Sequence, residues 1–355
     1  MIPNQVDHEY DFGSWKGYAG QFSLDLLKEL ESHNDVEYIE EDTMVWAWGM
    51  ESESAPSWGL TRISQRILDL KKDYSYASTA GAGVDVYVID SGVYKDHSDF
   101  ESRATSLANF VAGEEETDTC GHGTHVAGII AGRQFGVAKA ANIYAIKVLN
   151  SSGQGSTSQV LAGINHMVRH ASKDPSRKKV VNMSLGGTYS KTLNEAVSAA
   201  VLEHNLPFFV AAGNTGDDAC RYSPAAAPEA FPVGGSDNTD QIGWYSCVGP
   251  CVKIFAPGSG IVSDWNRPGS AKIMDGTSMA APHVAGVAAL FLSSGNKYTK
   301  AKDLYADILR YATPKIIRGP FGADDRTTQS LLYNKMEDVV KGARKGARKG
   351  RKNKH

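Results

Sequence analysis

Residues 276–283 read GTSMAAPH and lie between two apolar segments. The preceding residues 272–274, KIM, are typical of a short strand, and the small, apolar run 284–292 is typical of a buried helix. Ser278 is therefore predicted at a strand-to-helix junction, where helix N–H groups without a partner can bind an oxyanion. The alternative is that Thr277 or Ser278 only caps a core helix. Because capping does not call for Met, Ala-Ala, Pro and His behind the serine, we favour a nucleophile.

A serine nucleophile needs a histidine base and a carboxylate that orients this base. Residues 84–89, VDVYVI, form a buried-strand pattern that ends at residues 90–92, DSG. This pattern predicts a carboxylate at the carboxyl end of a strand, where open α/β sheets hold their sites. Residues 121–128, GHGTHVAG, place a histidine at the start of a helix of small residues. Alone, DSG could be an ordinary turn and the histidine a buried core residue.

In the order Asp90, His122 and Ser278, these motifs resemble the subtilisin family of serine proteases, and the chain is most similar to its proteinase K-like branch. The resemblance implies that Ser278 attacks the scissile carbonyl, His122 transfers the proton and Asp90 orients His122. It also implies that Asn214, which follows the strand-like residues 207–212, donates a hydrogen bond to the oxyanion. Without Ser278, an asparagine after glycine would be read as a turn residue.

Strand-like and helix-like segments alternate from residue 63 onward. The strand-like segments are 84–89, 143–148, 180–183 and 208–212, and the helix-like segments are 124–131, 158–170 and 192–204. Such alternation predicts right-handed crossovers and a parallel sheet with helices on both faces. We therefore expect a subtilisin-like, doubly wound α/β catalytic domain over residues 50–320.

The first 49 residues resemble the second half of the family's inhibitory propeptide. Ser23 precedes apolar residues at helical spacing, and residues 36–42, VEYIEED, alternate as a strand. The resemblance implies an intramolecular inhibitor whose last segment lies in the substrate cleft, with cleavage between Trp48 and Gly49. The first strand and helix of the family propeptide are not visible, so we expect a partial α+β propeptide domain over residues 1–49. The alternative is a stray amphipathic hairpin.

Substrate contacts follow from the resemblance. Two glycine-rich segments match the walls that the family pairs with a substrate backbone, and a third segment matches the pocket floor. These residues are Ser184, Leu185, Gly186 and Gly187 in one wall, Gly153, Gln154 and Gly155 in the other, and Ala211, Ala212 and Gly213 in the floor. Exposed backbone groups bind any extended peptide. We expect broad specificity, with an apolar or aromatic residue before the cut bond.

The chain has four cysteines. The resemblance implies a disulfide between Cys220 and Cys251 as in proteinase K-like enzymes, and hence an oxidising compartment. Cys120 and Cys247 are unassigned, and the pairings Cys120–Cys247 and Cys247–Cys251 stay open. A metal cluster is not expected, because the cysteines lack paired ligand spacing with histidine.

The chain departs from the family pattern at the residues of a calcium site. In proteinase K-like enzymes a carboxylate at the position of Lys253 holds calcium together with backbone carbonyls near Pro228 and Ala230. A lysine offers no oxygen ligand, so we predict that this site is empty. Calcium at other positions stays open, and no cofactor is expected to be required for catalysis.

Composition places the chain among globular proteins, with 41% hydrophobic and 22% charged residues. The formal net charge is −3, but residues 341–355 carry eight lysines and arginines, which leaves −11 on the rest. The acidic body argues against nucleic-acid binding by the globular part. After a C-terminal extension over 321–340, the basic residues 341–355 are predicted to be a disordered tail.

No apolar run is long enough to cross a bilayer, and the first residues lack the pattern of a secretory signal. The family resemblance nevertheless implies an extracellular protein, with the vacuole as an alternative. The sequence thus predicts a monomeric serine endopeptidase zymogen that acts on proteins and peptides and is inhibited by its own propeptide. Two alternatives are a catalytically silent binding module with this fold and a polyanion-binding protein that uses its basic tail.

Overall fold

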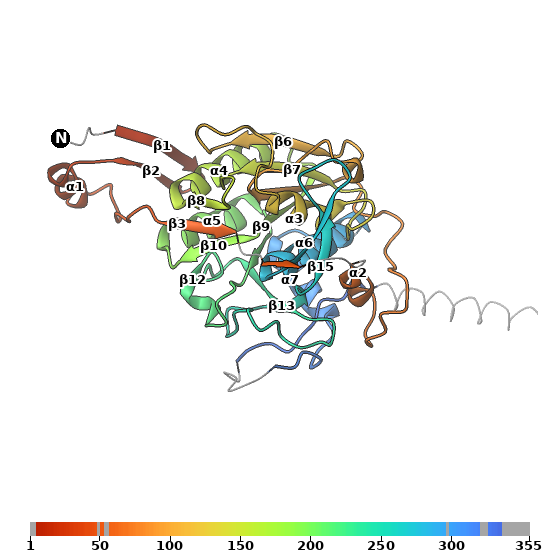
Figure 1. Ribbon diagram of the computed structural model, residues 1–355. Helices are drawn as coiled ribbons and strands as arrows, with labels where there is room; N and C mark the ends of the chain where they lie inside the picture. Colours follow the sequence, from red (N-terminus) through yellow and green to blue (C-terminus); the bar gives the residue numbers. More distant parts are fainter. Residues whose placement is uncertain (1–4, 48–49, 53–56, 296–297, 320–325, 336–355) are drawn as a thin grey trace, which may run out of the picture.

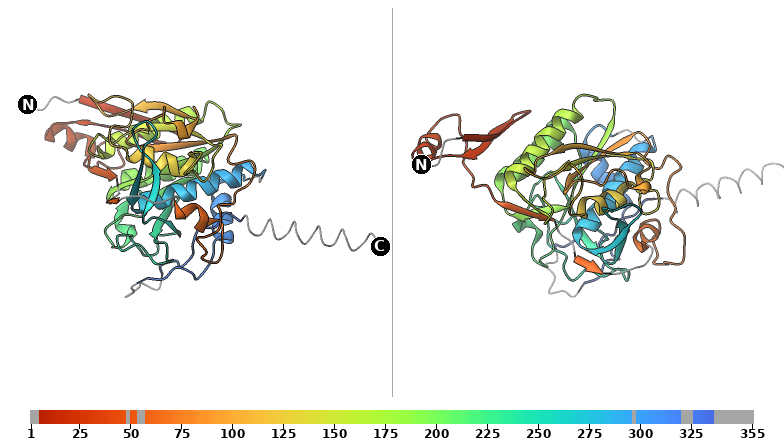
Figure 2. Two further views of the ribbon diagram at one scale, coloured as in Figure 1. Left: turned by 45° about the vertical axis from the view of Figure 1, so that its right-hand side comes forward. Right: turned by 45° about the horizontal axis from the view of Figure 1, so that its top comes forward.

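The computed structural model describes residues 5–47, 50–52, 57–295, 298–319 and 326–335. Helices cover both sides of a central sheet, and the N-terminal residues lie along one side of the molecule (Figure 1, Figure 2). None of the helices in these residues is long and apolar enough to cross a membrane.

The central sheet contains seven strands in the order β14-β13-β11-β9-β5-β7-β6, and all neighbouring strands are parallel. In chain order they are β5 (Val84–Asp90), β6 (Ala104–Asn109), β7 (Asn142–Lys147), β9 (Lys178–Met183), β11 (Phe208–Ala211), β13 (Phe231–Ser236) and β14 (Ile254–Pro257). The four predicted strands correspond to β5, β7, β9 and β11, so the prediction of a doubly wound parallel sheet is confirmed.

The two faces of the sheet bury different residues of the same strand. In β5, Val86 and Val88 belong to a core that also contains residues of three helices, which are α3 (His122–Ala131), α6 (Thr277–Ser293) and α7 (Ala301–Tyr311). Tyr87 and Ile89 belong to a second core, to which α4 (Thr157–Ala171) and α5 (Lys191–His204) contribute. A strand buried on both faces reads as a continuous apolar run, which is why the sequence predicted β5 so clearly.

Two of the three smaller antiparallel sheets contain strands of the catalytic region, and three short helical segments accompany them. The first sheet contains, in order, β12 (Tyr222–Ser223), β10 (Leu185–Thr188), β3 (Met44–Ala47) and β8 (Gln154–Ser156). The second contains β15 (Ile261–Asp264), β16 (Ala271–Asp275) and β4 (Met50–Ser52). The helical segments are α2 (Trp58–Ile63), η1 (Ser98–Phe100) and η2 (Ala219–Arg221).

The N-terminal segment begins with an antiparallel hairpin of β1 (Gln5–Phe12) and β2 (Trp15–Gln21), followed by α1 (Leu24–Glu31). The predicted cap of α1 is confirmed, because the Leu26 N–H donates to Ser23 Oγ. The hairpin packs against α4 and α5, where Tyr10 and Phe12 are buried (Figure 1). The Tyr10 hydroxyl donates to the Ser158 carbonyl at 3.1 Å and so joins the hairpin to the start of α4.

The strand predicted over residues 36–42 is wrong, because no strand forms there and β3 begins only at Met44. Two acidic residues of this segment, Glu40 and Asp42, cap helices instead. A Glu40 carboxylate oxygen accepts from the Thr192 N–H in the first turn of α5 at 2.8 Å. An Asp42 oxygen accepts from the Ser158 N–H in the first turn of α4, also at 2.8 Å. Each carboxylate satisfies helix N–H groups that lack an intrahelical partner and lies at the positive end of the helix dipole.

Residues 326–335 belong to the segment that the sequence assigned to a C-terminal extension. Leu331, Leu332 and Tyr333 are buried, and Leu331 forms β-bridges with Phe255 and Thr313. The rest of that segment, at 320–325 and 336–340, and the basic tail over 341–355 lie outside the described residues.

A buried ion pair attaches α2 to the sheet domain. Arg62 Nε donates to Asp240 Oδ1 at 2.7 Å, and both side chains are at most 5% exposed. We expect Arg62→Met to lower the free energy of unfolding by about 3–5 kcal/mol, because it leaves a buried charge on Asp240 without compensation.

Urea unfolding in a Ser278→Ala background, which prevents self-digestion, measures this loss. Arg133→Met is the matched control, since the ion pair of Arg133 with Glu101 is exposed and its removal should cost no more than about 1 kcal/mol. Equal effects of the two substitutions would contradict the prediction.

Candidate active site

Three predicted catalytic residues lie at the ends of elements that meet at one edge of the sheet. Asp90 is the last residue of β5, His122 is the first residue of α3, and Ser278 is the second residue of α6. His122 Nδ1 lies 2.7 Å from Asp90 Oδ1, and both residues are at most 2% exposed. The hydrogen bond places the proton on Nδ1, so Nε2 carries the lone pair that a general base needs. The Ser278 hydroxyl donates to the Ser184 carbonyl at 2.9 Å.

Asp118 is a buried carboxylate that sequence reasoning missed. Its Oδ1 accepts from Ser91 Oγ at 2.9 Å and from the Gly121 N–H at 2.7 Å. Its Oδ2 accepts from the Thr124 N–H at 2.8 Å. Asp118 therefore joins the turn after β5 to the first turn of α3 and holds the two elements that carry Asp90 and His122. Burial raises the pKa of Asp118, against the hydrogen bonds that favour its charged form. The sequence could have indicated Asp118, because an acidic residue just before a helix N-terminus interacts favourably with the helix dipole.

Lys147 is a second missed residue, at the end of β7. It is fully buried, and its ammonium donates to the carbonyls of Ser91 and Leu149 at 3.0 and 2.8 Å. Its charge is balanced by Glu114, whose Oε2 lies 3.1 Å away. Lys147 thus supports the turn that follows Asp90. The sequence could have indicated the role of Lys147, because it is a single lysine in an apolar strand and a charge buried there needs partners.

Asn214 is oriented by the first residue of α6. Asn214 Oδ1 accepts from the Thr277 N–H at 2.9 Å and from Thr277 Oγ1 at 2.7 Å. The amide oxygen is thereby occupied, and the Nδ2 donor has no partner among the described residues. The side chain can therefore offer an N–H next to the N-terminus of α6.

The two predicted substrate walls lie on either side of β3. Trp46 lies opposite Gly186 of one wall and opposite Gln154 of the other, so β3 occupies the position of a bound strand between them. The pairings on one side are Ala47 with Leu185, Trp46 with Gly186 and Val45 with Gly187, and on the other Trp46 with Gln154, Val45 with Gly155 and Met44 with Ser156. Gly153 directly precedes β8, and Ser184 directly precedes β10.

The chain pairs with the domain again after the predicted junction. In β4, Met50 lies opposite Asp275 of β16, which ends just before α6. Trp48 and Gly49, between which cleavage was predicted, lie outside the described residues. The strands on either side of them, β3 and β4, both pair with strands of the domain.

The predicted pocket floor lies at the end of β11, where Ala211, Ala212 and Gly213 are buried. Gly213 has φ +107°, a conformation that favours glycine, and a Cβ there would lie 2.9 Å from Cys247 Sγ. The Cys247 N–H donates to the Gly213 carbonyl at 2.9 Å. Cys247 therefore lies directly behind the floor, a position that the sequence did not indicate.

The disulfide between Cys220 and Cys251 is confirmed, with 5.4 Å between the two Cα atoms. Cys120 and Cys247 are both free thiols, so neither alternative pairing is formed. Cys120 is partly buried two residues before His122, and burial raises the pKa of its thiol. Among the residues that the structure describes, no three His, Cys, Asp or Glu side chains are placed to hold a metal ion.

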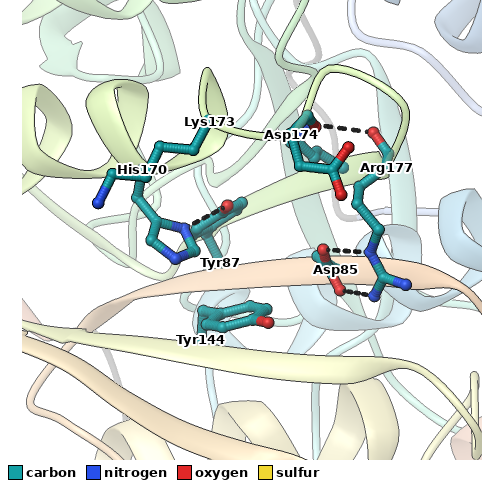
Figure 3. Close-up of a pocket in the computed structure, with 8 residues that line it drawn as sticks. Asp85, Tyr87, Tyr144, His170, Lys173, Asp174 and Arg177 are labelled. Atoms are coloured by element: carbon teal, nitrogen blue, oxygen red, sulfur yellow. Dashed lines mark hydrogen bonds and ion pairs between the residues drawn. The ribbon is translucent and has the colours of Figure 1, made fainter.

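A cavity of about 200 Å³ lies at the opposite end of β5 from Asp90 (Figure 3). Two of its lining charges are paired with each other, because Arg177 Nε donates to Asp85 Oδ2 at 2.8 Å. The Tyr87 hydroxyl and His170 Nδ1 lie 2.9 Å apart. At about 3.3 Å per residue, Asp85 lies roughly 16 Å from Asp90 along the strand. This cavity is therefore separate from the catalytic edge.

Two family models match the chain. The subtilase family matches residues 81–337, and peptidase inhibitor I9 matches residues 2–47. Among curated proteins, subtilisin-like serine protease pepC of Aspergillus niger is 46% identical over 295 residues, which are 79% of this chain and 55% of that protein. Subtilase-type proteinase psp3 of Schizosaccharomyces pombe is 42% identical over 342 residues, 94% of this chain and 74% of psp3.

A solved structure, that of a cold-adapted subtilisin-like serine proteinase, is 42% identical to this chain with a TM-score of 0.72. The match covers 79% of this chain and 99% of that one. The chain spans only 55–62% of the length of the first two curated relatives that it matches. The fold, the sequence identity and the family model agree, and the chain therefore belongs to the subtilase family.

Proposed function

We propose that the chain is a serine endopeptidase that is made as a zymogen. Ser278 attacks the scissile carbonyl, His122 takes the proton on Nε2 and returns it to the leaving amine, and Asp90 stabilises the imidazolium. The 2.7 Å hydrogen bond between buried Asp90 and His122 is the observation that carries this proposal. Asn214 Nδ2 and the Ser278 N–H stabilise the oxyanion, a contribution that is typically worth about 10² to 10³ in turnover for one donor.

The substrates are extended segments of proteins and peptides. A substrate strand would take the place of β3 and pair with β8 and β10 through backbone groups, which read little of the sequence. The floor of Ala211, Ala212 and Gly213 carries no charge, so it favours an apolar or aromatic residue before the cut bond. Specificity is otherwise broad.

Residues 2–47, which match inhibitor I9, act as an intramolecular inhibitor. Two interactions support this role: β3 fills the groove between the walls, and Glu40 and Asp42 cap α5 and α4. Self-cleavage between Trp48 and Gly49 would leave β3 bound like a product until the propeptide dissociates. The disulfide favours an oxidising compartment, and we infer an extracellular or vacuolar location.

Mass spectrometry of the purified chain before and after incubation tests the proposal. We expect the wild type to lose about 49 N-terminal residues, because its own Ser278 cuts the junction. Ser278→Ala is the control and should stay intact. A new N-terminus far from Gly49 would contradict the junction. An intact wild type that also fails to react with a serine-directed phosphonate would favour a catalytically silent binding module.

We also propose that no calcium binds at the backbone carbonyls near Pro228 and Ala230. By the family resemblance, Lys253 takes the place of a carboxylate ligand, and an ammonium there would repel a divalent cation. Lys253→Asp is expected to add one calcium, with tighter binding and a higher melting temperature in calcium than in chelator. Calorimetric titration of both chains measures this difference. Calcium binding at these carbonyls by the wild type would contradict the proposal.

A further inference from the structure

Asp264, the last residue of β15, is a buried carboxyl group that the proposed mechanism does not use. It is fully buried, and neither carboxyl oxygen accepts a hydrogen bond from a donor among the described residues. Its Oδ2 packs against α3, 2.7 Å from where a Cβ on Gly128 would lie and 3.0 Å from where one on Gly132 would lie. Asp99 Oδ2 is closer still to the Gly132 position. Two buried carboxyl groups thus face each other across Gly132, and they would repel if both were charged.

The contacts of His97 indicate which group carries a proton. His97 Nε2 lies 3.0 Å from the Ser270 carbonyl, which can only accept, so Nε2 carries a hydrogen. The Asp99 N–H is directed at His97 Nδ1 at 3.3 Å, so Nδ1 is an acceptor and the ring is neutral. Asp264 Oδ1 lies 3.4 Å from the same Nδ1. A carboxylate there would face a lone pair, whereas a protonated carboxyl group would donate to it.

Asp99 is the better hydrogen-bonded member of the pair, because both of its carboxyl oxygens accept from the Gln134 N–H, at 2.9 and 3.0 Å. Burial, the charge of Asp99 and a hydrogen bond between the two carboxyl groups raise the pKa of Asp264 to about 8, and the cations Arg103 and Lys139 only partly oppose this. These surroundings favour the neutral form of the Asp264 carboxyl group at pH 7. The charged or titratable groups around it and its hairpin are His97 and Asp99 at η1, Arg103 before β6, His125 on α3, Lys139 after α3 and Lys272 on β16.

Asp264 begins the turn 264–270, which lies over the N-terminal end of α3. The Trp265 ring lies against Gly121, where no side chain could fit beneath it. Asn266 Nδ2 donates at 3.1 Å to the carbonyl of Asp118, whose side chain holds the first turn of α3. A shift of this turn would therefore reach the helix end that carries His122.

We propose that Asp264 is a positioning residue, held as a neutral carboxylic acid, which keeps the turn 264–270 against the first turn of α3. This turn thereby holds His122 in place for catalysis. This inference therefore rests on the proposed function. Loss of the Asp264 proton in alkaline solution puts a second negative charge beside Asp99. The turn then moves away from α3, and turnover falls.

Asp264→Asn tests this, because the amide is neutral at every pH and can donate to His97 Nδ1. We would measure kcat of the mature enzyme on a peptide substrate from about pH 6 to pH 10, with each chain normalised to its value at pH 7. We expect the wild type to lose about tenfold in kcat above pH 8, with KM little changed, and the Asp264→Asn chain to lose less than about twofold. Asp96→Asn, an exposed change in the same region, should follow the wild type. Superimposable profiles would overturn the proposal.

A second measurement does not depend on activity and so separates this inference from the proposed function. In Ser278→Ala protein with ¹³Cγ-labelled aspartate, one carboxyl signal should titrate near pH 8 and be absent from the Asp264→Asn version. The folded state holds this proton more tightly than the unfolded state, so its stabilising effect is complete below about pH 4 and is lost as the pH rises to 8. The melting temperature of the wild type should fall relative to that of Asp264→Asn across this range. If no aspartate titrates above pH 6, Asp264 is charged and the proposal fails.

Discussion

Replacing Ser278 with alanine is expected to lower kcat by about 10⁶-fold, which corresponds to about 8 kcal/mol of lost transition-state stabilisation. This magnitude is the one known for loss of the nucleophile in subtilisin, the enzyme that lends its name to this kind of fold. The physical reason is that Ser278 supplies the attacking oxygen, and a methyl group in its place leaves His122 with no proton to accept. The N–H groups at the start of α6 remain, so weak residual catalysis by the oxyanion site is expected.

The measurement is turnover of a chromogenic peptide by the mature form. Since Ser278→Ala cannot cut its own junction, a trace of active enzyme should process it and then be removed by an inhibitor that binds the wild type covalently. Ser294→Ala, at the exposed end of the same helix, is the matched control and should keep full activity. Similar turnover by the Ser278→Ala chain would show that another residue is the nucleophile.

Replacing Asp90 with asparagine is expected to lower kcat by about 10⁴-fold, with little change in KM, as for the equivalent change in the convergent triad of the chymotrypsin type, which has an unrelated fold. Asp90 Oδ1 accepts from both His122 Nδ1 and the Ser91 N–H, each at 2.7 Å. An asparagine either turns its amide nitrogen toward His122, which reverses the tautomer, or keeps its oxygen there. In both cases the negative charge that stabilises the imidazolium is lost.

Steady-state kinetics with a short peptide separates the two parameters. Asp96→Asn is the control, because it makes the same chemical change on an exposed residue six positions along the chain. Circular dichroism should show that the Asp90→Asn chain is folded, since Asp90 Oδ2 has no hydrogen-bond partner to lose among the described residues. A loss that appears mainly as a higher KM would mean that Asp90 acts in substrate binding and not on His122.

The parallel sheet and the positions of Asp90, His122 and Ser278 could be predicted because their signals are local. A strand buried on both faces is apolar throughout, and a reactive residue at a strand or helix end is marked by the change of pattern around it. The strand predicted over residues 36–42 failed for the opposite reason. Alternation of polar and apolar residues is the same whether the polar side chains face water or cap a helix. Glu40 and Asp42 cap helices that begin more than 100 residues later.

The buried charges around the site could not be assigned from the sequence. Asp118 and Lys147 hold the turns that carry the catalytic residues, but their partners come from several elements. Asp264 becomes a candidate neutral acid only because Asp99 and His97, more than 160 residues earlier, lie against it. The sequence does not show whether a charged side chain lies in water or in the core. The energy of the charge depends on the dielectric and on the neighbours that folding supplies.

The amino-acid sequence by itself therefore determined the order of the proposed catalytic residues, the elements that carry them and, through a family resemblance, an N-terminal segment similar to an inhibitory propeptide. These features depend on local periodicity and on short motifs, which can be read from each chain segment without knowing its neighbours in the fold. Tertiary structure alone decided that the inhibitory segment caps two helices, that Cys247 lies behind the pocket floor and that Asp264 faces a second carboxyl group. Such contacts join distant segments, and their energies arise only when folding removes the groups from water.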